Sequence, residues 1–437
     1  MTFMKNQESK IKVCVIGGGA AGMLSAITAA ENGADVTLFE KNKSQKIMES
    51  ERFFDNAYLG KKLLITGKGR CNVTNDCSLD EFLKNTPVGG KFMYAAFNSF
   101  TPQDVMDFFT KGGTPLKVER GNRVFPISDK SIDILRVLKN KLFENNVRVF
   151  NKKVCDIVTE DGVFTSVVLD DKNEMFFDRC IVATGGASYP QTGSDGDGYK
   201  FAEKTGHTIK EIKPSLVPLV SHDKACRDMM GLSLKNVTVS VIDNKKNKVI
   251  FKEMGEMLFT HFGMSGPLIL LASSHMRDMS ENRYTVSIDL KPSLDEKTLD
   301  NRLLSDFGKY INKNMDNAMG DLLPSKMIVP FLNKCGIRKE QKPNSLTKEE
   351  RRTILETFKS FKIDVHSFRP VDEAIITSGG VATKEINPST MESKLVKGLY
   401  FAGEVIDVDA YTGGFNLQVA FSTANLAGRN ASLTDNQ

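Results

Sequence analysis

The sequence predicts an α/β fold in which a Rossmann-like domain, built from two distant parts of the chain, is interrupted by a β-barrel-like insertion and a helical insertion. Three observations lead to this prediction. The chain opens with a strand, a glycine turn, a helix and a second strand; strands and glycine loops return near its end; the stretch between is first rich in strands and then in helices. With 437 residues, 40% of them hydrophobic and 26% charged, the chain can form two or three globular domains.

The N-terminal elements follow from residue type and from the glycines between them. Ile11 to Ile16 is rich in Val and Ile and predicts a buried strand, and Gly17 to Gly22 forms the turn after it. Met23 to Glu31 predicts a helix that ends at Asn32-Gly33, and Val36 to Phe39 predicts the next strand. Together these segments form a βαβ unit.

Capping residues and periodicity mark the later elements of the first part. Thr101 begins a helix, and Ser131 to Asn145 predicts another with one apolar face. Strands are expected near 147–158, 163–170 and 174–183.

Alternation and capping boxes mark the two insertions. Residues 236–243 alternate in polarity and turn into 248–252, which predicts a hairpin, and 284–290 predicts another strand. Capping boxes at Ser293–Glu296 and Thr347–Glu350 predict helices. We therefore expect the first part of the Rossmann-like domain at 1–207, the β-rich insertion at 208–292, the helical insertion at 293–361, a return strand of the β-rich insertion at 362–378, and the second part of the domain at 379–437.

The glycine turn carries a dinucleotide-binding fingerprint. Gly17, Gly19 and Gly22 have the GxGxxG spacing, and Glu40 ends the second strand 23 residues after Gly17. Such glycines allow a tight turn, the approach of a pyrophosphate and close packing of helix on strand, while the acid accepts from ribose hydroxyls. An acid at this place argues for FAD or NAD rather than NADP. The alternative is a glycine turn kept for packing alone.

Two distant strands and a late helix favour FAD. Ile181 to Gly186 and Leu399 to Glu404 are buried strands that end in glycine turns, and Thr412 to Gln418 leads into a helix of small residues. NAD needs only the first βαβ unit, whereas a two-part FAD domain also uses a distant C-terminal segment whose helix N-terminus stabilises reduced flavin. Besides the residues of the fingerprint, we expect the cofactor to contact Ala20, Ala21, Lys41, Val154, Ala183, Thr184, Gly185, Gly186, Gly403, Glu404, Asp407, Gly414, Phe415, Asn416 and Leu417.

Several long motifs then resemble one family. They are Gly17–Gly22, Leu63–Asn75, Arg123–Ser128, Ala183–Pro190, Gly255–Pro267, Gly379–Val381, Thr390–Lys394 and Gly403–Gln418. In these motifs the chain resembles the bacterial FAD-binding flavoproteins called YhiN-like or BaiN-like, which include aminoacetone oxidases and a reductase of 3-oxo bile-acid enones. The resemblance implies a three-part architecture like that of the fumarate reductase flavoproteins, and it implies that Arg70, Asn72 and Thr74 lie near the flavin, together with Cys71 between them.

The cofactor is expected to be noncovalent. Some fumarate-reductase relatives attach FAD to a His, and this chain has no His before His207. A second GxGxxG is also missing from the sequence. We therefore expect NAD(P)H to dock transiently at the flavin face, or the electrons to come from another source.

Three residues are candidates for catalysis. His261 lies in a glycine-rich loop and has an intrinsic pKa suited to proton transfer, although a structural role in its own loop is the alternative. Tyr189 and Tyr411 flank glycine turns and could donate to a carbonyl oxygen, or they pack around the cofactor. Cys71, beside Arg70, has either a lowered pKa or a packing role.

These features favour reduction of a carbon–carbon double bond conjugated to a carbonyl, as in a 3-oxo steroid or bile-acid enone. One alternative is an amine oxidase acting on a small amino ketone such as aminoacetone. Another is an FAD protein associated with nucleic acid, because residues 41–70 hold eight basic and three acidic side chains. A net charge of +5 is too weak to favour nucleic acid, so the expected partner is a small molecule.

The remaining composition sets further expectations. Seven Cys do not fit a fully paired disulfide framework, and five scattered His show no metal signature, so a cytoplasmic protein without a bound metal is expected. Val13 to Ala30 carries no charge, but its glycines argue against a signal peptide or a membrane span. The stretch 42–59, with Phe53, Phe54 and Tyr58, is either a substrate flap or a neutral surface loop.

Overall fold

The computed structural model describes residues 10–44 and 53–434. The chain divides into two compact units, unit 1 with Met1–Lys213 and Ile375–Gln437, and unit 2 with Pro214–Ala374. The chain passes from unit 1 into unit 2 between residues 213 and 214 and returns between residues 374 and 375. These boundaries differ from those at 207/208 and 378/379 that the sequence predicts. The reason is a two-stranded sheet in which β11 (Ile209–Ser215) pairs with β19 (Ile376–Val381), so that the first strand after the expected boundary begins in unit 1.

Unit 1 is built on a five-stranded sheet in the order β20-β10-β1-β2-β6. Each neighbouring pair in this order is parallel. The strands are β1 (Lys12–Ile16), β2 (Asp35–Phe39), β6 (Arg148–Phe150), β10 (Arg179–Val182) and β20 (Leu399–Phe401). Because β20 comes from the C-terminal part and pairs with β10, this is a Rossmann-like α/β domain made from two distant parts of the chain. The carboxyl ends of parallel strands lie at one edge, where such sheets bind ligands.

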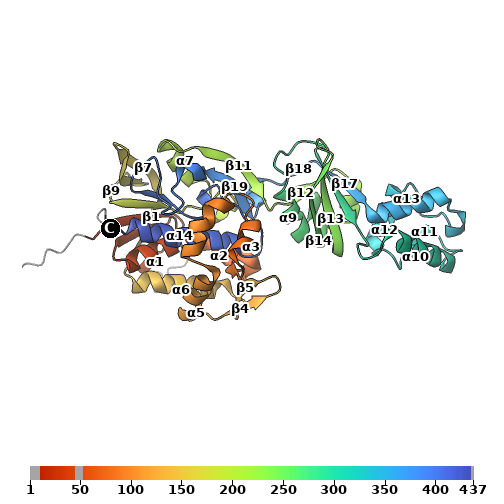
Figure 1. Ribbon diagram of the computed structural model, residues 1–437, viewed down its shortest axis with the longest axis horizontal. Coiled ribbons are helices and arrows are strands. Elements are labelled where there is room, and N and C mark those ends of the chain that lie inside the picture. The colour runs from red at the N-terminus through yellow and green to blue at the C-terminus, as the bar shows by residue number, and fades with distance from the viewer. Residues whose placement is uncertain (1–9, 45–52, 435–437) are drawn as a thin grey trace, which may run out of the picture. The chain divides into compact units, whose positions relative to one another are not determined.

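The first and last helices of unit 1 pack against each other (Figure 1). These are α1 (Ala20–Glu31) and α14 (Phe415–Ala431). A Cβ on Gly428 would lie 2.6 Å from the backbone oxygen of Ser25, so the missing side chain allows the two helices to approach closely.

The other elements of unit 1 surround this core. Two three-stranded antiparallel sheets have the orders β3-β5-β4 and β7-β8-β9. Their strands are β3 (Thr74–Asn75), β4 (Leu116–Glu119), β5 (Arg123–Pro126), β7 (Val154–Glu160), β8 (Val163–Leu169) and β9 (Glu174–Phe176). The helices are α2 (Lys61–Ile65), α3 (Leu79–Lys84), α4 (Tyr94–Ser99), α5 (Pro102–Lys111), α6 (Ser131–Glu144) and α7 (Asp197–Lys204), with short 3-10 turns η2 (Thr66–Gly69), η3 (Gly90–Met93), η4 (Pro190–Thr192), η7 (Thr383–Glu385) and η8 (Gly403–Val405).

Unit 2 contains a seven-stranded antiparallel sheet in the order β17-β16-β13-β14-β15-β12-β18. Its two end strands, β17 and β18, follow each other in the chain, so the segment 361–368 links both ends of the sheet. The strands are β12 (Leu219–Val220), β13 (Ser233–Asp243), β14 (Lys248–Thr260), β15 (Gly263–Ser265), β16 (Tyr284–Asp289), β17 (Phe361–Val365) and β18 (Ser367–Phe368).

The helical segment shares one hydrophobic core with this sheet. Phe331 and Phe358, from helices, contact each other, and Phe331 also stacks on Phe361 of β17. The helices and 3-10 turns of unit 2 as a whole are α8 (Lys224–Asp228), α9 (Pro267–Ser273), α10 (Glu296–Lys309), α11 (Met315–Ala318), α12 (Ser325–Lys334), η5 (Pro343–Ser345), α13 (Lys348–Lys359) and η6 (Val371–Glu373).

The two expected capping boxes have different outcomes. The box at Thr347 and Glu350 is confirmed, with both reciprocal hydrogen bonds present. The box at Ser293 is wrong, because Asp295 caps α10 by accepting a hydrogen bond from the Thr298 N–H. An aspartate two residues further on competes successfully for the same helix start.

Candidate functional site

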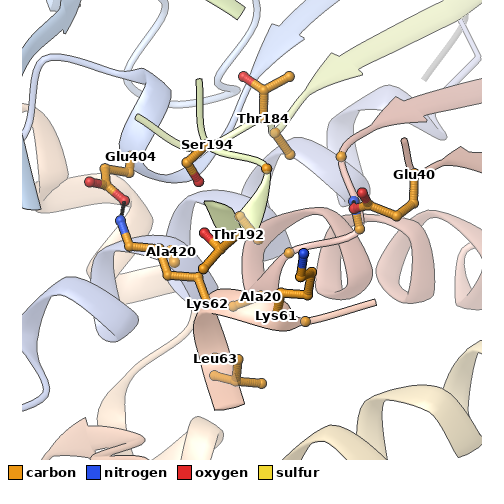
Figure 2. Close-up of a pocket in the computed structure, with 18 of the residues that line it drawn as sticks. Ala20, Glu40, Lys61, Lys62, Leu63, Thr184, Thr192, Ser194, Glu404 and Ala420 are labelled. Carbon is orange, nitrogen blue, oxygen red and sulfur yellow. Dashed lines mark hydrogen bonds and ion pairs between the residues drawn. The ribbon is translucent and has the colours of Figure 1, made fainter. Parts of the chain in front are cut away.

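A cleft in unit 1 brings together the glycine turn, the end of β2, the start of α2 and the first turns of α14 (Figure 2). Its empty volume, counted together with the solvent at its open side, is about 1350 Å³. The cleft lies at the carboxyl ends of the parallel strands, since Ile16, Phe39 and Ala183 all line it.

The three glycines of the fingerprint have different tasks. Gly17 has φ +107°, and a Cβ there would lie 2.6 Å from the Ala183 oxygen. A Cβ on Gly22 would lie 1.8 Å from the Gly17 oxygen, so this glycine lets α1 pack on the turn. Gly19, by contrast, lines the cleft, and among the described residues no atom apart from those of its chain neighbours and its own helix lies within 4 Å of its Cβ position. Gly17 and Gly22 therefore serve the fold, and Gly19 leaves room for a ligand.

The N-terminus of α1 is open to the cleft. No side chain caps this helix, and its first turn holds no acidic residue. The N–H of Met23 donates to the Gly19 oxygen, whereas the N–H groups before it lie where a helix offers no internal acceptor. Ala20 and Ala21 both line the cleft. Free N–H groups at the positive end of a helix fit a pyrophosphate.

Glu40 follows the last residue of β2 and contacts the glycine turn. Its Oε2 accepts from the Gly18 N–H at 2.9 Å, and its Oε1 accepts from the N–H and the side-chain amide of Asn42, both at 2.7 Å. A carboxylate offers about four acceptor positions, so one remains on Oε2 for a ribose hydroxyl. Burial raises the pKa of the Glu40 carboxyl, although these hydrogen bonds oppose the shift. Gly18 and Asn42 were not among the expected residues, and the glycine run at 17–19 was the available clue to Gly18.

Glu40→Gln is expected to lower FAD affinity at neutral pH by about tenfold, or about 1.4 kcal/mol. In the parent protein, FAD affinity should be full while Glu40 is a carboxylate and fall as the pH drops through its pKa. Because burial raises that pKa, the fall should begin at a higher pH than for an ordinary glutamate. Fluorescence titration with FAD across pH measures this. A variant with an unchanged pH profile would contradict the role of Glu40.

A second polar group lies at the other end of the cleft. Glu404 Oε2 accepts from Lys62 Nζ at 2.6 Å, and Glu404 Oε1 accepts from the Thr377 N–H at 2.9 Å (Figure 2). Thr377 Oγ1 in turn accepts from the N–H groups of Ala187 and Ser188. Lys62, Ser188 and Thr377 were not expected from sequence, because they become neighbours of Glu404 only on folding.

The turn at 184–186 contributes one packing glycine. Thr184 lines the cleft, but its hydroxyl is buried without a partner among the described residues and faces α7, since a Cβ on Gly198 would lie 2.1 Å from Thr184 Oγ1. A Cβ on Gly186 would lie 2.5 Å from Thr377 Oγ1 and 2.9 Å from Glu404 Oε1. Gly186 thus allows Glu404 to lie against the turn.

Backbone packing and side-chain hydrogen bonds fix the start of α14. A Cβ on Gly414 would lie 2.2 Å from the Thr74 oxygen, and Thr74 Oγ1 donates to Gln418. Asn416 donates to the Ala410 oxygen at 2.7 Å and accepts from the Ala410 N–H at 3.0 Å. Asn416 and Leu417 line the cleft, whereas Gly414 and Thr74 do not. Gly414 and Thr74 therefore position the N-terminal end of α14, and Asn416 and Leu417 are the residues of that end that line the cleft.

Arg70, Cys71 and Asn72 do not line the cleft, although the family resemblance implies that they lie near the flavin. Arg70 does not line the cleft; it donates to Glu119 and Asp129, and its guanidinium lies 4.1 Å from the Phe125 ring centre. Cys71 is fully buried, and burial raises the pKa of its thiol, so a lowered pKa is wrong and the packing role holds. Asn72 Oδ1 is buried without a partner among the described residues. Contact of these residues with the flavin remains a prediction.

The expected cofactor residues divide into two groups. Those that line the cleft are Gly17, Gly19, Ala20, Ala21, Glu40, Lys41, Val154, Ala183, Thr184, Gly185, Glu404, Asn416 and Leu417. Those that do not are Gly22, Arg70, Cys71, Asn72, Thr74, Gly186, Gly403, Asp407, Gly414 and Phe415. Lining residues that sequence reasoning missed include Gly18, Asn42, Lys61, Lys62, Leu63, Thr192, Gly193 and Ser194.

None of the three catalytic candidates lines this cleft. His261 lies in unit 2 between β14 and β15, exposed, with its ring 5.0 Å from that of Phe262. Tyr189 precedes η4 with φ +52° and lies 6.0 Å from Lys62 Nζ, measured to its ring centre. The Tyr411 N–H donates to the Asn85 oxygen. A catalytic role for each remains a prediction.

Three of the eight basic residues in the stretch 41–70 pair with carboxylates in the described part of the chain. Lys41 pairs with Asp195 and Asp197, and Lys62 and Arg70 have their carboxylate partners as described. These ion pairs reduce the number of free positive charges that the stretch could present to nucleic acid. Of the stretch 42–59, residues 45–52 lie outside the described part of the chain. Phe53 contacts Phe143 of α6, which favours the surface-loop interpretation over a flap for this end of the segment.

Residues 10–44 and 53–434 lack two other kinds of feature. No helix there has the length and apolar character needed to cross a bilayer. No cluster of three or more His, Cys, Asp or Glu side chains there is placed to hold a metal ion.

Comparison with known proteins gives matches over nearly the whole chain. The family model described as HI0933-like protein Rossmann domain matches residues 11–430. A 3-dehydro-bile acid delta(4,6)-reductase of Clostridium scindens is 28% identical over 422 residues, 96% of this chain and 98% of that protein. A ribosomal RNA dihydrouridine synthase of Escherichia coli is 30% identical over 414 residues, 94% of this chain and 95% of that protein. The structure of a 3-ketosteroid delta1-dehydrogenase from Sterolibacterium denitrificans has a TM-score of 0.50 at 14% identity, covering 96% of this chain and 99% of that chain, and this likeness concerns the fold alone.

Proposed function

We propose, since this chain belongs to the HI0933-like family of FAD-dependent Rossmann-fold oxidoreductases, that it reduces a carbon–carbon double bond conjugated to a carbonyl group. The observation that carries this proposal is the cleft in unit 1, where an uncapped helix N-terminus, an open Gly19 and a free acceptor position on Glu40 lie together. This arrangement fits the pyrophosphate and ribose of FAD.

The names of two relatives support the reaction class. One is a delta(4,6)-reductase of a 3-dehydro-bile acid, and the other forms dihydrouridine in ribosomal RNA. Dihydrouridine differs from uridine by two hydrogens on a ring double bond that is conjugated to a carbonyl. Reduction of that ring double bond adds a hydride to the carbon β to the carbonyl and a proton to the α carbon.

The residues of the cleft would divide the work of holding FAD. The N–H groups at the start of α1 would bind the pyrophosphate, and Glu40 would accept from the adenosine ribose. The first turn of α14, with Asn416 and Leu417, would complete the site at its other end. When bound, FAD supplies the hydride from its ring. We expect the proton to come from a side chain such as Tyr189, Tyr411 or His261, and the electrons from NAD(P)H acting in turn.

Anaerobic reoxidation of the reduced protein tests the reaction class without presupposing the electron donor. Purified protein loaded with FAD is reduced with dithionite and mixed with a 3-oxo-4-ene steroid, and the return of oxidised-flavin absorbance is recorded. Rapid reoxidation with formation of the saturated ketone is expected. The proposal fails if neither an enone nor uridine-containing RNA reoxidises the flavin. Formation of hydrogen peroxide from aminoacetone in air would instead identify an amine oxidase.

A uridine in ribosomal RNA is the second candidate substrate, and the Escherichia coli relative is the observation that favours it. The ion pairs of Lys41, Lys62 and Arg70 favour a small molecule instead. The same reoxidation assay with protein-free ribosomal RNA separates the two. Reoxidation by RNA that weakens steeply with salt would assign the RNA substrate, because phosphate contacts are salt-dependent.

A further inference from the structure

We propose that the ion pair between Lys62 and Glu404 sets the reduction potential of bound FAD, with Lys62 supplying the positive charge at the flavin end of the cleft. Nothing in the comparisons assigns either residue a role. The inference rests on the proposed function, because it requires that FAD occupies this cleft.

The two side chains are held firmly and face the cleft. Lys62 Nζ lies 2.6 Å from Glu404 Oε2 and 2.7 Å from Ser188 Oγ. Their side chains are 27% and 18% exposed, so solvent screens the pair only in part. Both residues line the cleft, and Glu404 is fixed on its other side by the Thr377 N–H. The ammonium group therefore has one defined position in the site.

The position of Lys62 within the cleft points to the flavin. Glu40, the expected ribose ligand, marks the adenosine end together with Gly18 and Asn42. Figure 2 shows Lys62 and Glu404 next to each other, with Ala420 of α14 nearby, and Glu40 on the opposite side of the site. With the pyrophosphate at the start of α1, between the two ends, the isoalloxazine ring is left to the end with Lys62.

The charges determine the direction of the effect. Reduction places negative charge on the flavin, so a nearby cation stabilises the reduced form and a nearby anion destabilises it. Loss of Lys62 would leave the Glu404 carboxylate unopposed and lower the potential. Loss of the Glu404 charge would leave Lys62 unopposed and raise it.

Lys61 provides a matched control. It is the neighbouring lysine and also lines the cleft, but its Nζ donates to the Gln191 oxygen at 2.8 Å and lies 3.4 Å from Asn42 Oδ1, on the adenosine side. Replacing either lysine with methionine removes one positive charge from the same short helix. Only Lys62 is expected to distinguish reduced from oxidised FAD.

Spectroscopic redox titration of the FAD-loaded protein tests the inference. Lys62→Met should weaken binding of reduced FAD at least tenfold relative to oxidised FAD, which is a fall of about 30 mV for two electrons. Glu404→Gln should raise the potential, Lys62→Arg should restore it, and Lys61→Met should leave it unchanged.

Four outcomes would count against the proposed role of the ion pair or against the proposed function. Equal shifts in Lys62→Met and Lys61→Met would overturn the inference, because the effect would then be a general loss of charge. If Lys62→Met bound no FAD, a Glu404→Gln potential at or below that of the parent would overturn it. A parent protein that takes up no FAD would refute the proposed function, whereas normal uptake with unchanged potentials would refute this inference alone.

Discussion

Gly19→Ala is expected to lower FAD affinity by about 100-fold or more, or about 2.7 kcal/mol, and to leave the unliganded protein almost as stable as before. The added Cβ would meet no protein atom within 4 Å, and the backbone at Gly19, with φ −79° and ψ −171°, accepts alanine. In the cleft, however, that methyl group occupies the space in which the pyrophosphate would approach the N-terminus of α1. Titration with FAD and urea denaturation without FAD measure the two effects.

The control for this variant is Gly308→Ala in unit 2. A Cβ at Gly308 also meets no atom of the described residues within 4 Å, but the residue belongs to α10 of unit 2 and is not among the residues that line the cleft. We expect this variant to keep its FAD affinity and to gain slightly in stability, because alanine favours helix over glycine. Normal FAD affinity in Gly19→Ala would mean that the pyrophosphate binds elsewhere.

Gly22→Ala is expected to destabilise the protein itself, by about 3 kcal/mol, and to abolish FAD binding as a consequence. Its Cβ would lie 1.8 Å from the Gly17 oxygen and 3.0 Å from the Gly17 carbon, both backbone atoms that no rotamer change can move aside. Helix α1 would have to withdraw from the turn that it closes. The unfolding midpoint in urea, measured without FAD, should fall well below that of Gly19→Ala. Equal midpoints for the two variants would contradict this division of tasks between the glycines.

Parallel-sheet architecture could be read from local sequence because its elements are marked locally. The apolar run at 11–16, the glycine turn and the strand ending at Glu40 specify a βαβ unit with no distant information. The same holds for the Thr347 capping box, where donor and acceptor are three residues apart. The family motifs then extended this reading to the C-terminal part of the domain.

Ion pairs between distant residues could not be predicted in this way. Lys62 and Glu404 are 342 positions apart, and Arg70 meets Glu119 and Asp129 only because β4 and the loop after β5 fold over it. A charge in the sequence does not specify its partner, so the basic stretch 41–70 suggested nucleic acid as an alternative, although all five acids that pair with its Lys41, Lys62 and Arg70 come from other elements. The boundaries of the units moved for the same reason, since pairing of β11 with β19 is a long-range contact.

The sequence alone was therefore sufficient for the fold class, the cofactor type and the glycines that the turn requires, because spacing and backbone conformation are local properties. Tertiary structure was needed to pair Lys62 with Glu404. That pairing depends on which atoms lie within a few ångströms in space, and this is set by packing of segments that are remote in the chain.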